Sequence, residues 1–184
     1  MEQTMALEQE KIYTIEDIYA LPDGQRAELI DGKMYMMDPP NTVHQRIFYT
    51  LARKISDYID RKKGSCEVFL APFAVFLNQD DKNYVEPDIS VICDKSKLTE
   101  LGCNGAPDWV IEVTSPSNPQ NDYGIKLFKY RTAGVREYWI VNPQKKSIMV
   151  YDLENEKKSN QYTFEEDVPV CIYEDLHICI SSLL

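Results

Sequence analysis

The stretch PDWVIEVTSPSNPQNDYGIK, residues 107–126, places a carboxylate, Glu112, at the centre of an apolar run that is typical of a β-strand. Asp88 lies in the same way inside a second apolar run, YVEPDISVICD at residues 84–94. Burying an unpaired carboxylate is costly, so each acid is expected to have a partner, a metal ion or a catalytic role. The sequence therefore predicts a polar site shared by two buried strands.

The segments around these two strands predict a mixed α/β fold. A short amphipathic helix is expected at residues 13–21, followed by a hairpin that carries Glu28 on its first strand. This hairpin reverses at Asp31-Gly32, because glycine supplies the positive φ that a two-residue turn requires. Further strands are expected within residues 66–77, 137–143, 146–153 and, as short C-terminal strands, 161–182.

A long helix is expected after the two prolines at 39–40. Thr42 and Gln45 fit a capping box at its start, and Gly64 lies where a left-handed C-terminal cap would be expected. At 100° per residue the apolar side chains form one broad arc, from which His44 projects. The helix alone favours a core histidine with one hydrogen bond. The alternative is that His44 faces a polar site at the helix N-terminus.

A second helix is expected after the break SPSNPQND, residues 115–122, and Gly134 fits its C-terminal cap. The arc expected to be buried contains Ile125, Leu127, Phe128 and Thr132. The opposite arc contains Asp122, Lys126, Lys129 and Tyr130. Because the break is short, Lys126 is expected to lie near the end of the Glu112 strand, while pairing with Asp122 at i, i+4 is the plainer alternative.

The length and the net charge of the chain limit the number of domains and the classes of function to be considered. The 184 residues are close to the size of one domain, expected to span 1–184 with residues 1–12 flexible and an acidic strand region at 151–184. The net charge of −10 argues against a generally basic surface for nucleic acid. Residues 44–63, however, carry six Lys or Arg against two Asp, a local balance of +4. A solvated face is the more common reading of such a segment taken alone.

Neither a membrane span nor a secretory signal is expected. The longest apolar stretch, VFLAPFAVFL, has ten residues, and the N-terminal residues lack a basic region followed by an apolar one, so a cytoplasmic location is expected. The five cysteines are odd in number and show no CxxC spacing. They are therefore expected to be reduced packing residues.

Asp88 and Glu112 together suit a hard divalent cation, because Mg²⁺ takes one or two carboxylates and completes its shell with water and phosphate oxygens. Mn²⁺ is the alternative ion. The backbone carbonyl of Val113 could supply a further oxygen. Lys126 could then orient or help to deprotonate a water molecule and stabilise charge on a phosphate.

The order of these motifs resembles a known family. The segments ELIDG, a His at a helix start, EPDISV, PDWVIEVTSPS, DxxxKxxxY and GVREYWIVNP are similar to the Uma2 family of the PD-(D/E)xK superfamily, over roughly residues 13–152. The resemblance implies a restriction-endonuclease-like core, with a mixed sheet of four to five strands flanked by helices, an N-terminal hairpin and C-terminal β additions. It also implies Mg²⁺-dependent cleavage of DNA phosphodiester bonds.

Carried over by position, Pro87-Asp88 matches the PD pair, Glu112 matches the acid of (D/E)xK, and Lys126 matches a lysine moved to the following helix. His44 and Glu28 match positions that the family uses near the site.

The sequence departs from the simple motif at Thr114, which stands where the superfamily has lysine. Thr114 and Tyr130 are expected to line the pocket. Two functions follow: a DNA endonuclease that acts as a homodimer, because two-fold symmetry suits cutting both strands, or a catalytically inactive module that binds DNA or protein.

Overall fold

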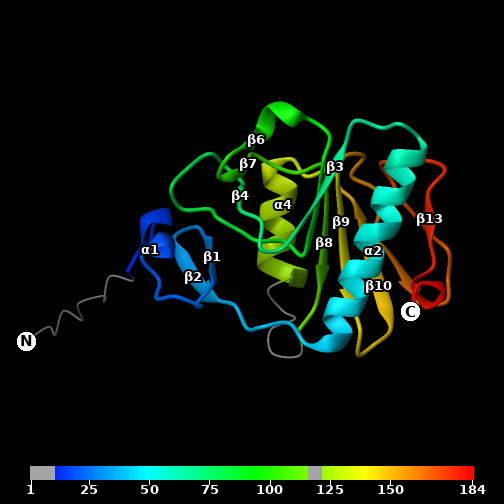
Figure 1. Cartoon of the computed structure of the whole chain (residues 1–184), viewed down its shortest axis with the longest axis horizontal. Coiled ribbons are helices and arrows are strands. Elements are labelled where there is room, and N and C mark those ends of the chain that lie inside the picture. The colour runs from blue at the N-terminus through cyan, green and yellow to red at the C-terminus, as the bar shows by residue number, and fades with distance from the viewer. Residues whose placement is uncertain (1–10, 116–121) are drawn as a thin grey trace, which may run out of the picture.

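The computed structural model describes residues 11–115 and 122–184 and contains a central six-stranded mixed sheet (Figure 1). The sheet order is β11 (Asn160–Thr163), β10 (Ser147–Asp152), β9 (Glu137–Asn142), β8 (Trp109–Val113), β5 (Ile89–Ile92) and β3 (Glu67–Leu70). β8 and β9 run parallel, and all other neighbours run antiparallel. The predicted mixed sheet is confirmed. It has six strands, one more than the four to five that the resemblance implied. Residues 1–10 of the segment expected to be flexible, and residues 116–121 of the expected break, lie outside the described residues.

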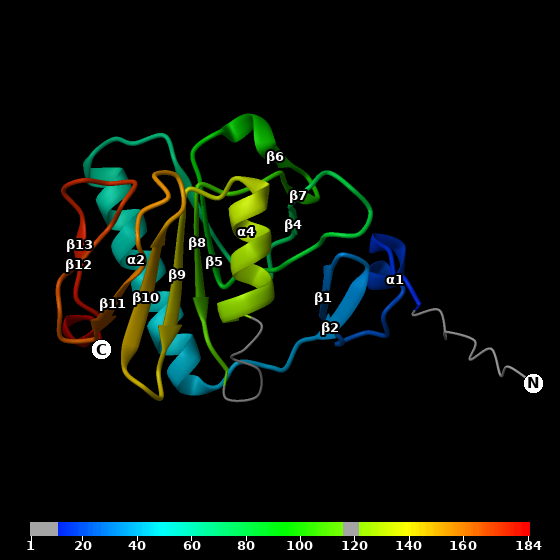
Figure 2. The same ribbon diagram turned by 180° about the vertical axis from the view of Figure 1, so that it is seen from behind.

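Helices cover both faces of this sheet (Figures 1 and 2). α2 (Thr42–Arg61) covers one face, and its buried arc packs against Trp109 and Trp139 of the two central strands. Each fully buried large apolar side chain contributes about 1.5–3 kcal/mol, so this arc is a main source of stability. The helix begins one residue earlier than expected, because the side chain of Asn41 accepts a hydrogen bond of 2.9 Å from the backbone N–H of His44.

The other face is covered by a π-helical turn (Asp122–Lys126) that continues into α4 (Leu127–Ala133). The buried arc expected for this helix is wrong. Phe128 is 62% exposed and Ile125 is also exposed, whereas Lys126, Lys129 and Tyr130 are buried. Phe128, Lys129 and Tyr130 lie within the regular helix, so the buried face is set by polar contacts and not by the apolar side chains, as for the Tyr130 hydroxyl that donates to Glu112. Lys129 pairs with Asp31 and so ties α4 to the hairpin.

The N-terminal elements lie at one side of the sheet (Figure 2). They are α1 (Ile15–Tyr19) and the hairpin of β1 (Ala27–Ile30) and β2 (Lys33–Met36). The predicted turn is confirmed, since Asp31 and Gly32 have φ angles of 50° and 75°. Leu29 exchanges two backbone hydrogen bonds, of 2.7 and 2.8 Å, with Tyr84, and these hold the hairpin against the segment that enters β5.

The apolar run at 66–77 forms two strands of different sheets, β3 and β4, and the segment between them contains a cis peptide bond before Pro72. Its second half, β4 (Val75–Phe76), joins β7 (Gly102–Asn104) and β6 (Leu98–Thr99) in a small sheet, after the short 3-10 helix η1 (Lys95–Lys97). Gly102 is required here, since a Cβ would lie 2.2 Å from the carbonyl oxygen of Ala74.

The C-terminal segment adds β12 (Val168–Pro169), β13 (His177–Ile178) and a 3-10 helix, η3 (Ile180–Ser182). Val168, Ile178 and Ile180 join the apolar cluster between α2 and the sheet. The expected C-terminal β additions are therefore present and close one side of the core. Across the described residues, no helix is long and apolar enough to cross a membrane.

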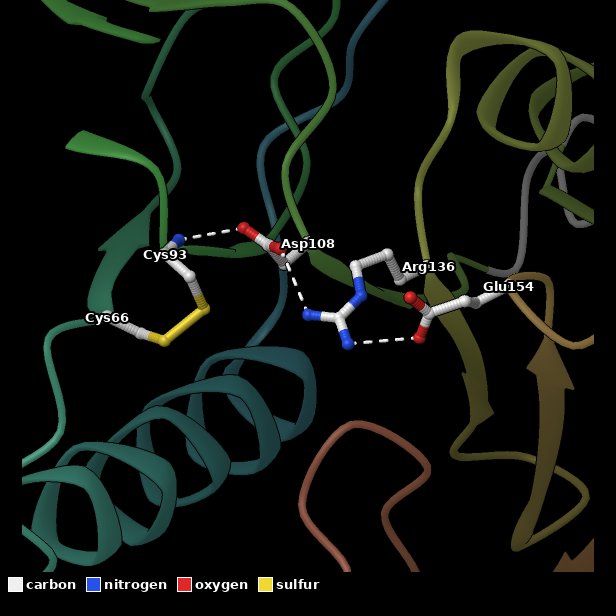
Figure 3. The surroundings of a disulfide bond; sticks show 5 residues. All are labelled: Cys66, Cys93, Asp108, Arg136 and Glu154. Carbon is white, nitrogen blue, oxygen red and sulfur yellow. Dashed lines mark hydrogen bonds and ion pairs between the residues drawn. A yellow bond between two sulfur atoms is a disulfide. The ribbon is translucent and has the colours of Figure 1, made fainter. Parts of the chain in front are cut away.

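The expectation that all cysteines are reduced is wrong for two of them (Figure 3). Cys66 and Cys93 form a disulfide across β3 and β5, because the register that pairs Glu67 with Ile92 brings the two cysteines opposite each other. Their separation of 27 residues gives no sign of this adjacency. The backbone N–H of Cys93 also donates to Asp108, as Figure 3 shows.

Candidate active site

Asp88 and Glu112, the two acids predicted within apolar strands, lie side by side. β5 and β8 are neighbouring antiparallel strands, and the register that pairs Ile89 with Ile111 places Asp88 opposite Glu112 one step further on. Both acids line a cleft of about 410 Å³. The cleft is also lined by Glu28 of β1, His44 of α2, and Asp122 and Lys126 of the π turn. Five separate elements therefore contribute charged or polar groups to one cavity.

Asp88 is fixed from two sides. Its Oδ2 accepts a hydrogen bond of 2.7 Å from the backbone N–H of Val113 and lies 3.0 Å from Nε2 of His44. His44 is thus in contact with the acid, as the less favoured of its two interpretations required. Its other ring nitrogen, Nδ1, is buried without a hydrogen-bond partner in the described chain.

Glu112 is buried, with 4% of its surface exposed. Its Oε1 accepts a hydrogen bond of 2.6 Å from the hydroxyl of Tyr130 and one of 2.9 Å from Nζ of Lys126. The backbone N–H of Asp88 approaches the other oxygen, Oε2, at 3.5 Å, the outer limit of a hydrogen bond. Tyr130 therefore holds the carboxylate from beneath and does not line the cleft directly.

Lys126 lies at the centre of the charge cluster. Its Nζ is 2.7 Å from Oε2 of Glu28, 2.9 Å from Oε1 of Glu112 and 3.7 Å from Oδ1 of Asp122. The i, i+4 contact with Asp122 is the longest of the three. Lys126 therefore reaches the site from the π turn. The position where the simple motif has its lysine is occupied by Thr114. Thr114 instead continues the sheet, donating its backbone N–H to the carbonyl of Val141, and does not line the cleft.

Glu28 is oriented by a group of residues that was not predicted from the sequence. The backbone N–H of Glu86 donates to Oε1 of Glu28 at 3.0 Å. The Glu86 carboxylate is in turn held by the guanidinium of Arg26 and, at 2.6 Å, by the hydroxyl of Tyr84. Glu86 directly precedes the Pro87-Asp88 pair, but no sequence pattern indicates that its backbone N–H contacts Glu28.

The electrostatics show an excess of negative charge. Burial raises the pKa of Glu112 to about 8, and Lys126 opposes this rise. Burial also raises the pKa of Asp122 to about 6. For Lys126, burial alone lowers the pKa, but Glu112, Glu28 and Asp122 outweigh it and raise the pKa well above its usual range. The ammonium is therefore charged at neutral pH, and one cation is shared among several acids.

This donor set fits a hard divalent cation. Within residues 11–115 and 122–184, no three His, Cys, Asp or Glu side chains are arranged as a closed metal cage. Mg²⁺ does not need such a cage, since it commonly takes one or two carboxylates and several waters. Asp88 and Glu112 are adjacent and line a cleft, and added positive charge would oppose the rise in the pKa of Glu112, which burial causes and neighbouring acids increase.

Comparison with known proteins agrees with this geometry. The family model Uma2, described as "Putative restriction endonuclease", matches residues 15–177. The chain belongs to the Uma2 family. The resemblance predicted from the sequence motifs is therefore confirmed.

Two relatives of this Uma2 protein extend the comparison. Protein slr1290 of Synechocystis sp., which is uncharacterized, is 27% identical over 128 residues, covering 69% of this chain and 66%, just under two thirds, of that protein. A crystal structure from Anabaena variabilis, described as a putative nuclease belonging to DUF820, has a TM-score of 0.75 and 22% identity. It covers 92% of this chain and 96% of that chain, and it shows that the two share a fold.

Removing the imidazole of His44 should affect the site more than the fold. We expect His44→Ala to lower metal-dependent DNA cleavage at least tenfold, because Asp88 loses the contact that orients it. The free energy of unfolding, measured by urea denaturation, should change by less than about 2 kcal/mol, because the ring borders a cleft and not a closed core. A loss of several kcal/mol with cleavage retained would make His44 a packing residue.

Proposed function

We propose that this Uma2 protein is a Mg²⁺-dependent endonuclease that hydrolyses phosphodiester bonds in DNA. The observation that carries the proposal is the position of Lys126, whose ammonium lies 2.9 Å from Glu112 and 2.7 Å from Glu28. In the simple motif, a lysine at the position of Thr114 would place its ammonium beside two acids in a cleft. Here the π turn supplies it instead.

The contacts of each residue indicate the role that we propose for it. Asp88 and Glu112 would hold Mg²⁺ or Mn²⁺, with the backbone carbonyl of Val113 as a further oxygen ligand. When bound, the ion supplies Lewis-acid stabilisation of a phosphate oxygen and a more acidic water. Lys126, which is protonated, stabilises negative charge on the phosphate and orients the attacking water.

Three further residues keep this geometry in place. Glu28 and Tyr130 fix the ammonium and the Glu112 carboxylate, and His44 fixes Asp88. Because each of these three touches a proposed reacting group or metal ligand, their replacement should lower the rate without changing the fold.

The proposal also covers the oligomeric state, the DNA substrate and the location of the enzyme. We infer a homodimer acting on duplex DNA, because two sites related by two-fold symmetry can cut the two antiparallel strands. A cytoplasmic location agrees with a DNA substrate. The competing function, a catalytically inactive module that binds DNA or protein, is favoured by Thr114 at the motif position and by the net charge of −10, which weakens the attraction of DNA to the protein as a whole.

A cleavage assay separates the two functions. Supercoiled, linear duplex and single-stranded DNA would be incubated with Mg²⁺, Mn²⁺ or EDTA, beside the Glu112→Gln variant. We expect cleavage that requires the metal and a loss of at least about 10²-fold in the variant. The matched control is Glu137→Gln, which alters a fully buried glutamate of the neighbouring strand β9 and should retain cleavage. DNA binding without any cleavage would favour the binding module.

A further inference from the structure

The solvent-facing side of α2 carries two arginines and a tyrosine in line. Arg46, Tyr49 and Arg53 are spaced i, i+3 and i+7 and are all exposed, and 57% of the Tyr49 surface is accessible. At 100° per residue these three positions fall within about 60° of one another, so they form one stripe. An exposed tyrosine between two arginines is unusual, because large aromatic side chains contribute most when they are covered.

The first part of this stripe contains no acid, and the nearest acid along the helix is Asp57, one helical turn after Arg53. Residues 42–54 contain Arg46, Arg53 and Lys54 but no Asp or Glu, in a chain whose net charge is −10. Neither arginine has an ion pair in the described chain. Other bases do, such as Lys62 with Asp175 and Lys95 with Glu67. The first three turns of α2 therefore carry a net positive charge on a mainly acidic protein, and this gives a local field that attracts a polyanion.

The stripe is continuous with the candidate active site. Asn41, His44, Gln45 and Phe48 of the same helix line the cleft. Gln45 is exposed and lies one helical turn before Tyr49, so it connects the cleft to the stripe. Figure 1 shows α2 running across one face of the sheet, and residues at the start of this helix are among those that line the cleft. A chain that leaves the cleft at Gln45 would meet Arg46 and Tyr49 next.

We propose that the outer face of α2 binds the sugar-phosphate backbone of the DNA strand whose scissile bond lies in the cleft, through Arg46 and Arg53, with Tyr49 packing between them. This inference rests on the proposed function and assigns its DNA-binding surface. Arginine suits the task, because its planar guanidinium binds phosphate oxygens through two parallel hydrogen bonds. Tyrosine can donate to a phosphate or stack on an exposed base.

The spacing of the arginines fits this ligand. Seven residues along an α-helix correspond to a rise of about 10 Å, and B-DNA rises about 3.4 Å per nucleotide of one strand. Because both side chains are long and their attachment points are about 10 Å apart, Arg46 and Arg53 can reach two separate phosphates of one strand. Base edges are not needed for such contacts, so the surface should contribute affinity and position and not sequence preference.

The test is the salt dependence of DNA binding. Dissociation constants of a fluorescent duplex would be measured by anisotropy in EDTA, where no cleavage occurs, for the full chain and for an Arg46→Ala/Arg53→Ala variant. We expect at least a tenfold weaker Kd at low salt. The slope of log Kd against log salt should become shallower by about 1.8, which corresponds to two phosphate contacts.

A second readout is the cleavage kinetics of the same variant with Mg²⁺. KM should rise at least tenfold, while kcat stays within about twofold, because the arginines do not touch the reacting group. The matched control is Arg61→Ala/Lys63→Ala, which removes the same charge at the opposite end of α2 and should leave the salt slope and KM unchanged.

The outcomes keep this inference apart from the proposed hydrolysis. If the full chain cleaves DNA and the Arg46→Ala/Arg53→Ala variant keeps its Kd and slope, the surface assignment is overturned and the hydrolysis stands. An equal effect in the control variant would also overturn it, since net charge alone would then explain the loss. If the chain binds DNA through this stripe but cleaves none, the surface stands and the hydrolysis fails. Absence of any DNA binding overturns both.

Discussion

Replacing Lys126 by methionine is expected to abolish DNA cleavage and to destabilise the protein. The rate should fall by at least about 10²-fold, because the ammonium that contacts both Glu112 and Glu28 is lost. The free energy of unfolding should fall by about 3–5 kcal/mol at pH 8, since removing one partner of a buried ion pair leaves uncompensated charge. Cleavage rates and urea denaturation at the same pH measure the two effects.

The helix that carries Lys126 offers its own control. Lys129 is also buried and also forms an ion pair, but its partner is Asp31 at the hairpin turn and it does not line the cleft. Lys129→Met should therefore retain cleavage in the fraction that remains folded. Cleavage by Lys126→Met at the parental rate would remove this lysine from the mechanism and with it the proposed substitute for the motif lysine.

Much of the fold could be predicted from the sequence, because local patterns fix it. The hairpin follows from Asp31-Gly32, and the strands that carry Asp88 and Glu112 follow from apolar alternation around each acid. Their adjacency follows from the cost of burying a carboxylate without compensation. The resemblance to the Uma2 family, and not a local pattern, added Glu28 and His44 to the expected site, and the short break before its helix placed Lys126 near Glu112.

The rest depends on tertiary contacts that no local pattern encodes. The buried arc of α4 was predicted on the wrong side, because its inward face is set by the partners of Lys129 and Tyr130 on other elements, Asp31 and Glu112. The disulfide requires Cys66 and Cys93 to be opposite each other across two strands. Glu86 contributes a backbone N–H to Glu28, and a backbone donor leaves no mark in a sequence pattern.

The second large effect is a loss of stability with rising pH in the absence of divalent ions. The pKa of Glu112 is raised from 4.5 to about 8 in the folded protein, and that of Asp122 from 3.8 to about 6. The folded state therefore binds more protons than the unfolded state between these values, so the free energy of unfolding falls as pH rises. A shift of one pKa unit is about 1.4 kcal/mol, and we expect a fall on the order of a few kcal/mol between pH 4.5 and 8.

Urea denaturation in EDTA at pH 4.5, 6, 7 and 8 measures this fall, and the Glu112→Gln variant should reduce it because the amide does not titrate. Mg²⁺ added at pH 8 should restore stability by mass action, by about 2.7 kcal/mol at a concentration of 100 Kd. Asp88→Asn should lose that response, because one of the two proposed ligands is gone. Glu137→Gln should keep it, since Glu137 is buried on β9 and does not line the cleft. An equal Mg²⁺ response in Asp88→Asn and the parental protein would place the ion at another site, and a pH-independent stability would contradict the buried charge cluster itself.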